Sequence, residues 1–188
     1  MMRIGSLAVV VAFVLGGSSL ALGGEKITPE QAKQTWTAME KAHLTLAMAI
    51  TAAERDSKGQ AIGATGMVEK DQLTVEVPVF VGEKLMTAHV NNTGEVAETK
   101  PADKHPDAAK AKDIVKAFKD AKLTWTTVLE NAEKHSNGKA VCVQSMLKDN
   151  NIEIKVTCLT GDKLTYCIVD KTGKVTTEQT GKHEVKKP

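Results

Sequence analysis

The sequence of 188 residues contains one segment twice, and this repeat constrains the fold more than any other feature. Residues 42–100 align with residues 121–179 at a constant spacing of 79, without a gap and with 17 identical pairs in 59 positions. Unrelated segments would share only a few identities. The pattern therefore predicts two tandem copies of one supersecondary unit, which stack because a single copy buries too little core.

Each copy begins with the signals of a helix. Residues 28–31 read T-P-E-Q, which combines an N-cap hydroxyl, a proline at the first helical position and a glutamine placed for a capping box. In the second copy, Asp107 is the predicted N-cap. Apolar residues then recur at helical spacing over 32–53 and 111–132, which is typical of an amphipathic helix that faces a core.

The apolar stripe is interrupted at the same place in both copies, by His43 and Lys122. Thr45 and Thr124 follow two residues later and are predicted to cap a new helix. We expect either one kinked helix or two short helices in each copy.

The period of the apolar residues changes from 3.6 to 2 after Gly59 and Gly138, which we expect to end the helices. Alternation of this kind predicts antiparallel strands with one wet face. Pro78 cannot donate to a strand ladder, so its strand is expected at an edge or bulged at that position. The predicted strands are 61–69, 73–79 and 84–90 in the first copy, and 140–148, 152–158 and 163–169 in the second.

A turn motif closes each copy, H-V-N-N-T-G-E-V at 89–96 and I-V-D-K-T-G-K-V at 168–175. An Asx side chain at the first turn position can bond its own backbone, and the glycine three residues later can take the left-handed conformation. We interpret the motif as a hairpin with a short returning strand, because one carboxylate is far short of a calcium loop. The predicted turn residues are Asn91, Thr93, Gly94, Asp170, Thr172 and Gly173.

The second copy resembles the PepSY family, through its spaced helical alanines, a glycine that leads to a strand, and a strand that ends in V-D-x-x-T-G-x-V. The first copy departs from the family pattern at Asn91, Gly63, Gly66 and Pro78. PepSY domains occur on propeptides of secreted metallopeptidases and as separate exported or membrane-attached proteins, and they are thought to restrain peptidases. The layout is also similar to that of secreted β-lactamase inhibitor proteins, by analogy of architecture alone.

The predicted fold class is therefore α+β, with two tandem repeats. In each repeat, one kinked or two short helices pack on one face of a three- to four-stranded antiparallel β-meander. We expect the two copies to pack together, with helices on one side and a shared or adjoining pair of sheets on the other. The predicted organisation is a signal peptide at 1–23, repeat 1 at 24–100, a linker at 101–106, repeat 2 at 107–180 and a flexible basic tail at 181–188.

The N-terminal residues have the layout of a secretory signal peptide: Arg3, an apolar run over 7–15, and a small-residue region. The apolar run is too short to span a bilayer, so no stable membrane span is expected after cleavage. Localisation is predicted to be secreted or periplasmic. Without Arg3 the net charge is 24 − 23 = +1, which does not suggest a nucleic-acid partner.

The three cysteines, Cys142, Cys158 and Cys167, show no C-x-x-C spacing. They are either small apolar residues on strands or, in an exported protein, one oxidised pair with a spare thiol. Cys158 and Cys167 flank a predicted turn and are the candidate disulfide.

The other side chains suggest neither catalysis nor cofactor binding, so we predict a protein that is not an enzyme, with no cofactor and no metal site. The five histidines do not lie at metal-ligand spacing. No nucleophile elbow or phosphate loop is present. Glu76 and Glu153 could be brought together as paired carboxylates only by the fold, and alternation alone requires such charges on a wet sheet face.

We expect an exported, non-enzymatic binding module whose partner is another exported protein, with a peptidase as one candidate. The polar sheet face or an exposed strand edge is the expected contact surface. Two alternatives remain open, a thiol-dependent or metal-binding envelope protein and a small-ligand carrier.

Overall fold

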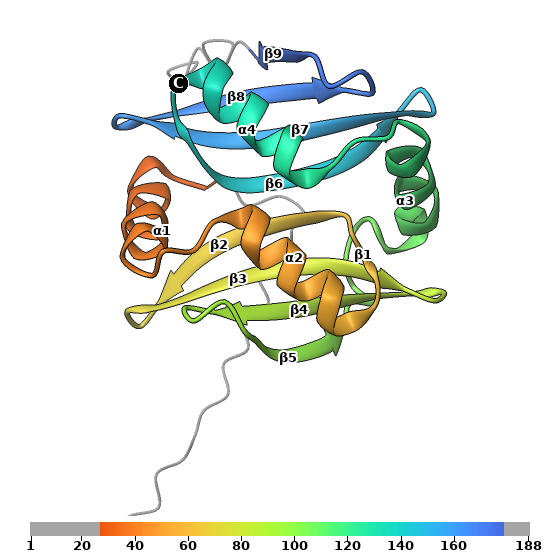
Figure 1. Ribbon diagram of the computed structural model, residues 1–188, viewed down its shortest axis with the longest axis horizontal. Helices are drawn as coiled ribbons and strands as arrows, with labels where there is room; N and C mark the ends of the chain where they lie inside the picture. Colours follow the sequence, from red (N-terminus) through yellow and green to blue (C-terminus); the bar gives the residue numbers. More distant parts are fainter. Residues whose placement is uncertain (1–26, 179–188) are drawn as a thin grey trace, which may run out of the picture.

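The computed structural model describes residues 27–178, which form one antiparallel sheet with two helices across one face and two helices at its sides (Figure 1). The predicted signal peptide, the predicted tail and His183 lie outside the described residues. The α+β layout with two helices followed by a meander in each half is confirmed.

The two halves have the same order of elements. In the first half these are α1 (Pro29–Lys41), α2 (Leu46–Ser57), β1 (Gln60–Ala61), β2 (Gly63–Glu69), β3 (Gln72–Val81), β4 (Lys84–Asn91) and β5 (Val96–Pro101). In the second half they are the 3₁₀ helix η1 (Ala108–Lys110), α3 (Ala111–Asp120), α4 (Trp125–Ser136), β6 (Lys139–Lys148), β7 (Asn151–Thr160), β8 (Lys163–Asp170) and β9 (Val175–Glu178). From α4 to β8, each bound lies 79 residues after its counterpart, with β6 matching β1 and β2 together.

Local side-chain chemistry explains most helix boundaries. The Thr28 side chain accepts a bond from the backbone of Gln31 and completes the predicted capping box. Thr45 and Thr124 likewise accept from the third residue after them. His43 and Lys122 have φ values of 51° and 54°, so each half has two separate helices rather than one kinked helix.

The prediction that Asp107 caps the first helix of the second half is wrong. Its side chain makes no cap hydrogen bond, and α3 begins after η1. Asp107 Oδ2 instead accepts from Gln144 Nε2 at 3.1 Å, on a strand of the sheet. Tertiary contact with the sheet replaces the local cap.

Both halves share a single sheet with the strand order β5-β4-β3-β2-β6-β7-β8-β9, while β1 pairs with β3. The halves meet where β2 pairs antiparallel with β6, and we call this junction the seam. Ala64 pairs there with Val143, its own counterpart at the spacing of 79, and Gly63↔Gln144 mirrors Thr65↔Cys142. The seam therefore contains an approximate two-fold axis that relates the halves.

Pro78 does not lie on an edge strand, because β3 is paired on both sides. The irregularity predicted for it lies instead in the neighbouring strand, between β1 and β2. The Ile62 N–H donates to the Pro78 carbonyl at 2.9 Å. The Pro78 nitrogen, which carries no hydrogen, therefore faces the interruption between β1 and β2, where no ladder bond is needed from it. The second half has a register shift at the same place, between Ala140 and Cys142.

The glycines that follow the second helices do not reverse the chain themselves. The left-handed residues are Lys58 and Asn137, with φ of 54° and 51°. Gly59 and Gly138 are required by close packing instead, since a Cβ on Gly138 would lie 2.7 Å from the Leu159 carbonyl oxygen. The predicted helix ends are correct, but the glycines are needed there to avoid a steric clash with the neighbouring strand, not to supply a left-handed φ.

The core runs continuously through both halves, between the helices and the sheet. The first helix of each half also contacts the other half. Lys33 of α1 pairs with Asp162 in the β7–β8 turn, and its counterpart Lys112 pairs with Glu83 in the β3–β4 turn, at 2.9 and 3.0 Å. The first helices are therefore docked reciprocally.

Candidate functional site

The six predicted turn residues lie in two equivalent turns. Asn91 Oδ1 accepts from the backbone N–H of Thr93 and Glu95, and Asp170 Oδ1 makes the same set of bonds with Thr172 and Lys174. Gly94 and Gly173 have φ of 78° and 81°, the left-handed conformation that the motif predicts. The Thr172 hydroxyl also donates to Asp170 Oδ1 at 2.6 Å, and this bond, together with the backbone bonds, holds the pKa of the Asp170 carboxyl below its usual range.

The three cysteines are free thiols in the structure, including the predicted pair Cys158 and Cys167. These two sulfurs are buried beneath α4, where burial raises the pKa of the Cys158 thiol to about 12 and also raises that of Cys167. Cys142 lies at the seam with its sulfur 3.2 Å from Thr65 Oγ1, and burial raises its pKa as well. A raised thiol pKa disfavours the reactive thiolate, so the geometry does not favour a thiol-dependent function.

Native alkylation tests this assignment of the cysteines. We expect Cys158 and Cys167 to resist iodoacetamide at pH 8 in the folded protein, because both sulfurs are buried and protonated. All three cysteines should react after denaturation, as peptide mass spectrometry would show. Two cysteines that stay unmodified after denaturation, with a mass lower by two hydrogens, would establish the Cys158–Cys167 disulfide instead.

The sheet face opposite α2 and α4 carries a row of polar residues on β3, β4 and β5. Glu76, His89 and Glu98 lie directly across from one another on β3, β4 and β5, with His89 Nδ1 3.8 Å from Glu76 Oε1. Burial raises the pKa of Glu76 and lowers that of His89. Lys100 Nζ donates to Glu98 Oε1 at 2.6 Å.

The candidate carboxylate pair does not form. Glu76 lies on β3 and Glu153 on β7, so three strand spacings of roughly 14 Å in total separate them. Glu153 is instead 3.7 Å from Lys148. Across residues 27–178, histidine, cysteine and acidic side chains form no group of three that could hold a metal ion.

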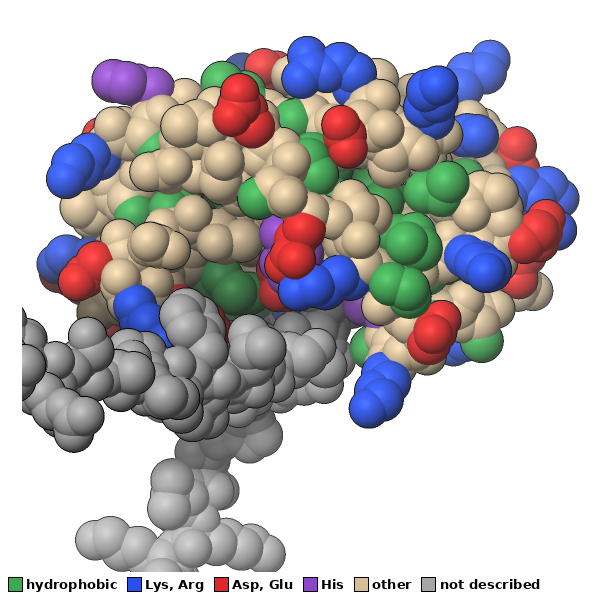
Figure 2. Space-filling view, turned by 90° about the horizontal axis from the view of Figure 1, so that it is seen from below, with side chains coloured by type: hydrophobic (Ala, Val, Ile, Leu, Met, Phe, Trp, Pro, Cys, Tyr) green, Lys and Arg blue, Asp and Glu red, His purple; other side chains and the backbone are tan. Residues whose placement is uncertain are grey.

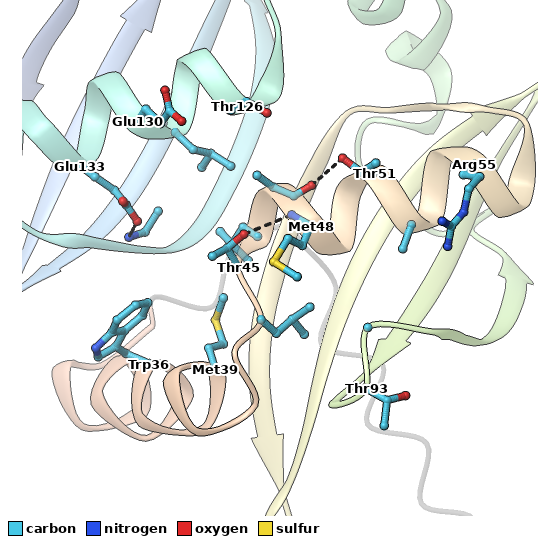
Figure 3. Close-up of a pocket in the computed structure, with 17 residues that line it drawn as sticks. Trp36, Met39, Thr45, Met48, Thr51, Arg55, Thr93, Thr126, Glu130 and Glu133 are labelled. Carbon is cyan, nitrogen blue, oxygen red and sulfur yellow. Dashed lines mark hydrogen bonds between the residues drawn. The ribbon is translucent and has the colours of Figure 1, made fainter.

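A groove of about 650 Å³ lies on the helix side, between α2 and α4 (Figure 3). We call it the seam groove. Each of these helices packs mainly on the strands of its own half, which leaves a hollow between them. The residues that line it are Trp36, Met39, Leu44, Thr45, Leu46, Ala47, Met48, Thr51, Ala52, Arg55, Thr93, Gly94, Thr126, Leu129, Glu130, Glu133 and Ala140.

The wall of the seam groove formed by α1 and α2 is largely apolar. Met39 and Leu46 are buried, whereas Met48 is 52% exposed and is the one large hydrophobic side chain that is exposed within the described part of the chain. Figure 3 shows Met48, Met39 and Trp36 along the same hollow. An exposed methionine beside an apolar floor is typical of an adaptable contact surface.

The α4 wall is acidic. Glu133 Oε1 accepts from the Ala140 N–H at 2.9 Å, and its Oε2 lies 4.0 Å from Lys139 Nζ. That same Nζ lies 5.5 Å from the centre of the Trp36 ring. Glu130 is exposed on the same wall, and in Figure 3 both glutamates lie on the α4 side, with Arg55 at the far end of α2. We call Trp36, Glu130 and Glu133 the acidic corner.

The groove is not predicted by the sequence pattern, because the apolar residues of both helices have the spacing of a core face. A signal was present in the repeat itself. Met48 corresponds to Thr127, Glu130 to Thr51 and Trp36 to Val115, so the distinctive groove residues lie at positions where the copies differ. Differences between copies mark positions that the shared fold does not require.

Charged side chains of both signs are interspersed on the face shown in Figure 2, without a patch of one sign.

None of the helices within residues 27–178 is long and apolar enough to cross a membrane.

Comparison with known proteins places the chain in no family. No family model and no curated protein matches the sequence. One similar solved structure is from Clostridium difficile 630 and is described as a "putative lipoprotein". It shares 17% identity, with a TM-score of 0.41, over 69% of this chain and 90% of the other.

Proposed function

We propose that this chain is an exported, non-enzymatic module that binds another protein through the seam groove, with a peptidase as one candidate partner. The observation that carries the proposal is the exposure of Met48 beside the buried apolar floor of the groove. Export is supported by the signal-peptide pattern of the first 23 residues, and the peptidase by the PepSY resemblance.

The groove is favoured over the two surfaces expected from sequence. The outer strand β5 is short and carries Glu98, Lys100 and Pro101, which are the features that protect an edge strand from pairing with another chain. On the open sheet face, the side chains of His89 and Glu76 are only 22% and 13% exposed, and Glu98 is paired with Lys100. The seam groove instead leaves apolar surface uncovered.

Site-specific photocrosslinking tests the groove as the contact surface. A photoreactive residue is placed at Met48 in the full-length chain and activated in the host's envelope, followed by mass spectrometry of the products. We expect a discrete crosslinked protein, which should also bind the purified mature chain and lose that binding when Met48 is replaced by serine. Because the Met48 side chain is half exposed, this change should leave the fold intact.

Thr127 is the matched control, since it is exposed at the equivalent position of α4 and does not line the groove. A photoreactive residue there should give no such product. Equal crosslinking at both positions, or no product at Met48, would contradict the proposal. Assays of the captured protein for peptidase activity, with and without the chain, decide the peptidase version.

A small-ligand carrier is the second candidate, favoured by the groove volume of about 650 Å³, which lies in the range of small-molecule sites. Native mass spectrometry of the mature protein distinguishes it. A bound small molecule that is lost on Met48→Ser would support the carrier and not the protein partner.

A further inference from the structure

We infer that the segment recognised by the seam groove is cationic and amphipathic, with a lysine or arginine side chain in the acidic corner and apolar side chains against Met48. This inference rests on the proposed function and adds the chemistry of the partner. It follows from the difference between the two walls of the groove, of which one is acidic and the other is largely apolar.

The first support is the distribution of charge around the groove. Glu130 and Glu133 line the α4 wall, while the opposite wall presents Met39 and Met48, with Arg55 at the far end of α2 (Figure 3). A ligand that crosses the groove therefore meets carboxylates on one side and methionines on the other. A segment with a basic face and an apolar face matches both walls.

The second support is the position of the chain's own Lys139. Its ammonium group lies over the Trp36 ring at 5.5 Å and 4.0 Å from a Glu133 oxygen, the arrangement in which an aromatic face and a carboxylate together attract a cation. The Lys139 side chain is 53% exposed, so it can move aside for a ligand. Glu130 is also exposed and can contact the arriving cation.

The third support is that two of the three residues of the acidic corner differ in the other half, where the counterparts of Trp36 and Glu130 are Val115 and Thr51. Glu133 has the counterpart Glu54, and each accepts a hydrogen bond from the backbone seven residues later, so this carboxylate is part of the shared architecture. The fold therefore requires Glu133 but not Trp36 or Glu130, which complete the corner.

Calorimetric titration of the mature chain with three synthetic peptides tests the inference. The peptides have the same length and the same apolar residues, and their polar positions carry lysine, glutamine or glutamate. We expect the lysine peptide to bind most tightly and to weaken with added salt, because the attraction is screened. Glu130→Gln should weaken its binding about two- to fivefold, the effect of one exposed charge pair.

Lys139→Gln provides a readout that a merely structural role would not produce. Removal of the competing ammonium should strengthen binding of the lysine peptide and leave the glutamine peptide unchanged. Glu40→Gln, an exposed change of equal charge on α1 outside the groove, is the control and should have no effect.

The outcomes separate this inference from the proposed function. Equal binding of the three peptides, abolished by Met48→Ser, would overturn the charge preference while supporting the groove as a peptide site. Preference for the glutamate peptide would also overturn it. If no peptide binds and Met48 gives no crosslink, both proposals are wrong.

Discussion

Neither half of the chain is expected to fold alone: residues 24–104 and residues 105–180, expressed separately, should each lack cooperative unfolding and dispersed NMR signals. A unit of this size buries little core. Separation would also expose the paired edges of β2 and β6 and remove α1 from the strands of the second half that it contacts. Mixing the two halves should restore the native NMR spectrum, because each half then supplies the strand edge and the helix contacts that the other half has lost.

The reciprocal ion pairs are not the main reason for this expectation. Lys33–Asp162 and Lys112–Glu83 are largely exposed, and such pairs contribute little stability. The shared sheet and continuous core dominate. Charge reversal at both pairs should therefore leave the full chain folded, and it serves as the control. A half that unfolds cooperatively by itself would contradict a core shared between the halves.

Gly63→Ala should destabilise the whole protein by about 1–3 kcal/mol or more, the range for overpacking. An added Cβ would lie 2.6 Å from the Val143 carbonyl oxygen, which is backbone and cannot rotate away. β2 and β6 would have to separate at the seam. Urea unfolding followed by circular dichroism measures the loss.

Cys142→Ala is the matched control, because Cys142 is the counterpart of Gly63 across the seam and already carries a Cβ. This change removes only the sulfur contact with Thr65 and should cost much less than Gly63→Ala. Equal free energies of unfolding for the two variants would show that close approach at the seam does not require the glycine.

Several elements could be predicted because their causes are local. Thr28, Thr45 and Thr124 form their caps through residues three positions away, and the Asn91 and Asp170 turns are held within five residues. Asp107 was predicted wrongly for the opposite reason. Its hydrogen-bond partner is a strand residue distant in the sequence, which no local pattern reveals.

In the candidate site, too, local features could be predicted from the sequence, whereas contacts between distant residues could not. Trp36, Met39 and Leu129 carry the helical period that marks a core face, and that period does not show where neighbouring helices separate. Glu130 and Glu133 read as ordinary helix surface until α4 is placed beside α2. The distances from Lys139 to Trp36 and Glu133 exist only in the folded chain.

From its sequence alone, the chain is determined to form two like units, each with helices followed by alternating strands, because hydrogen bonds and apolar periods act over a few residues. Tertiary structure decided that the units join through β2 and β6 in one sheet and that a groove remains above their junction. That choice depends on the close approach permitted by Gly63 and on the Met39 and Thr35 side chains that fill the space left by Gly66. Such complementarity between distant surfaces has no period in the sequence.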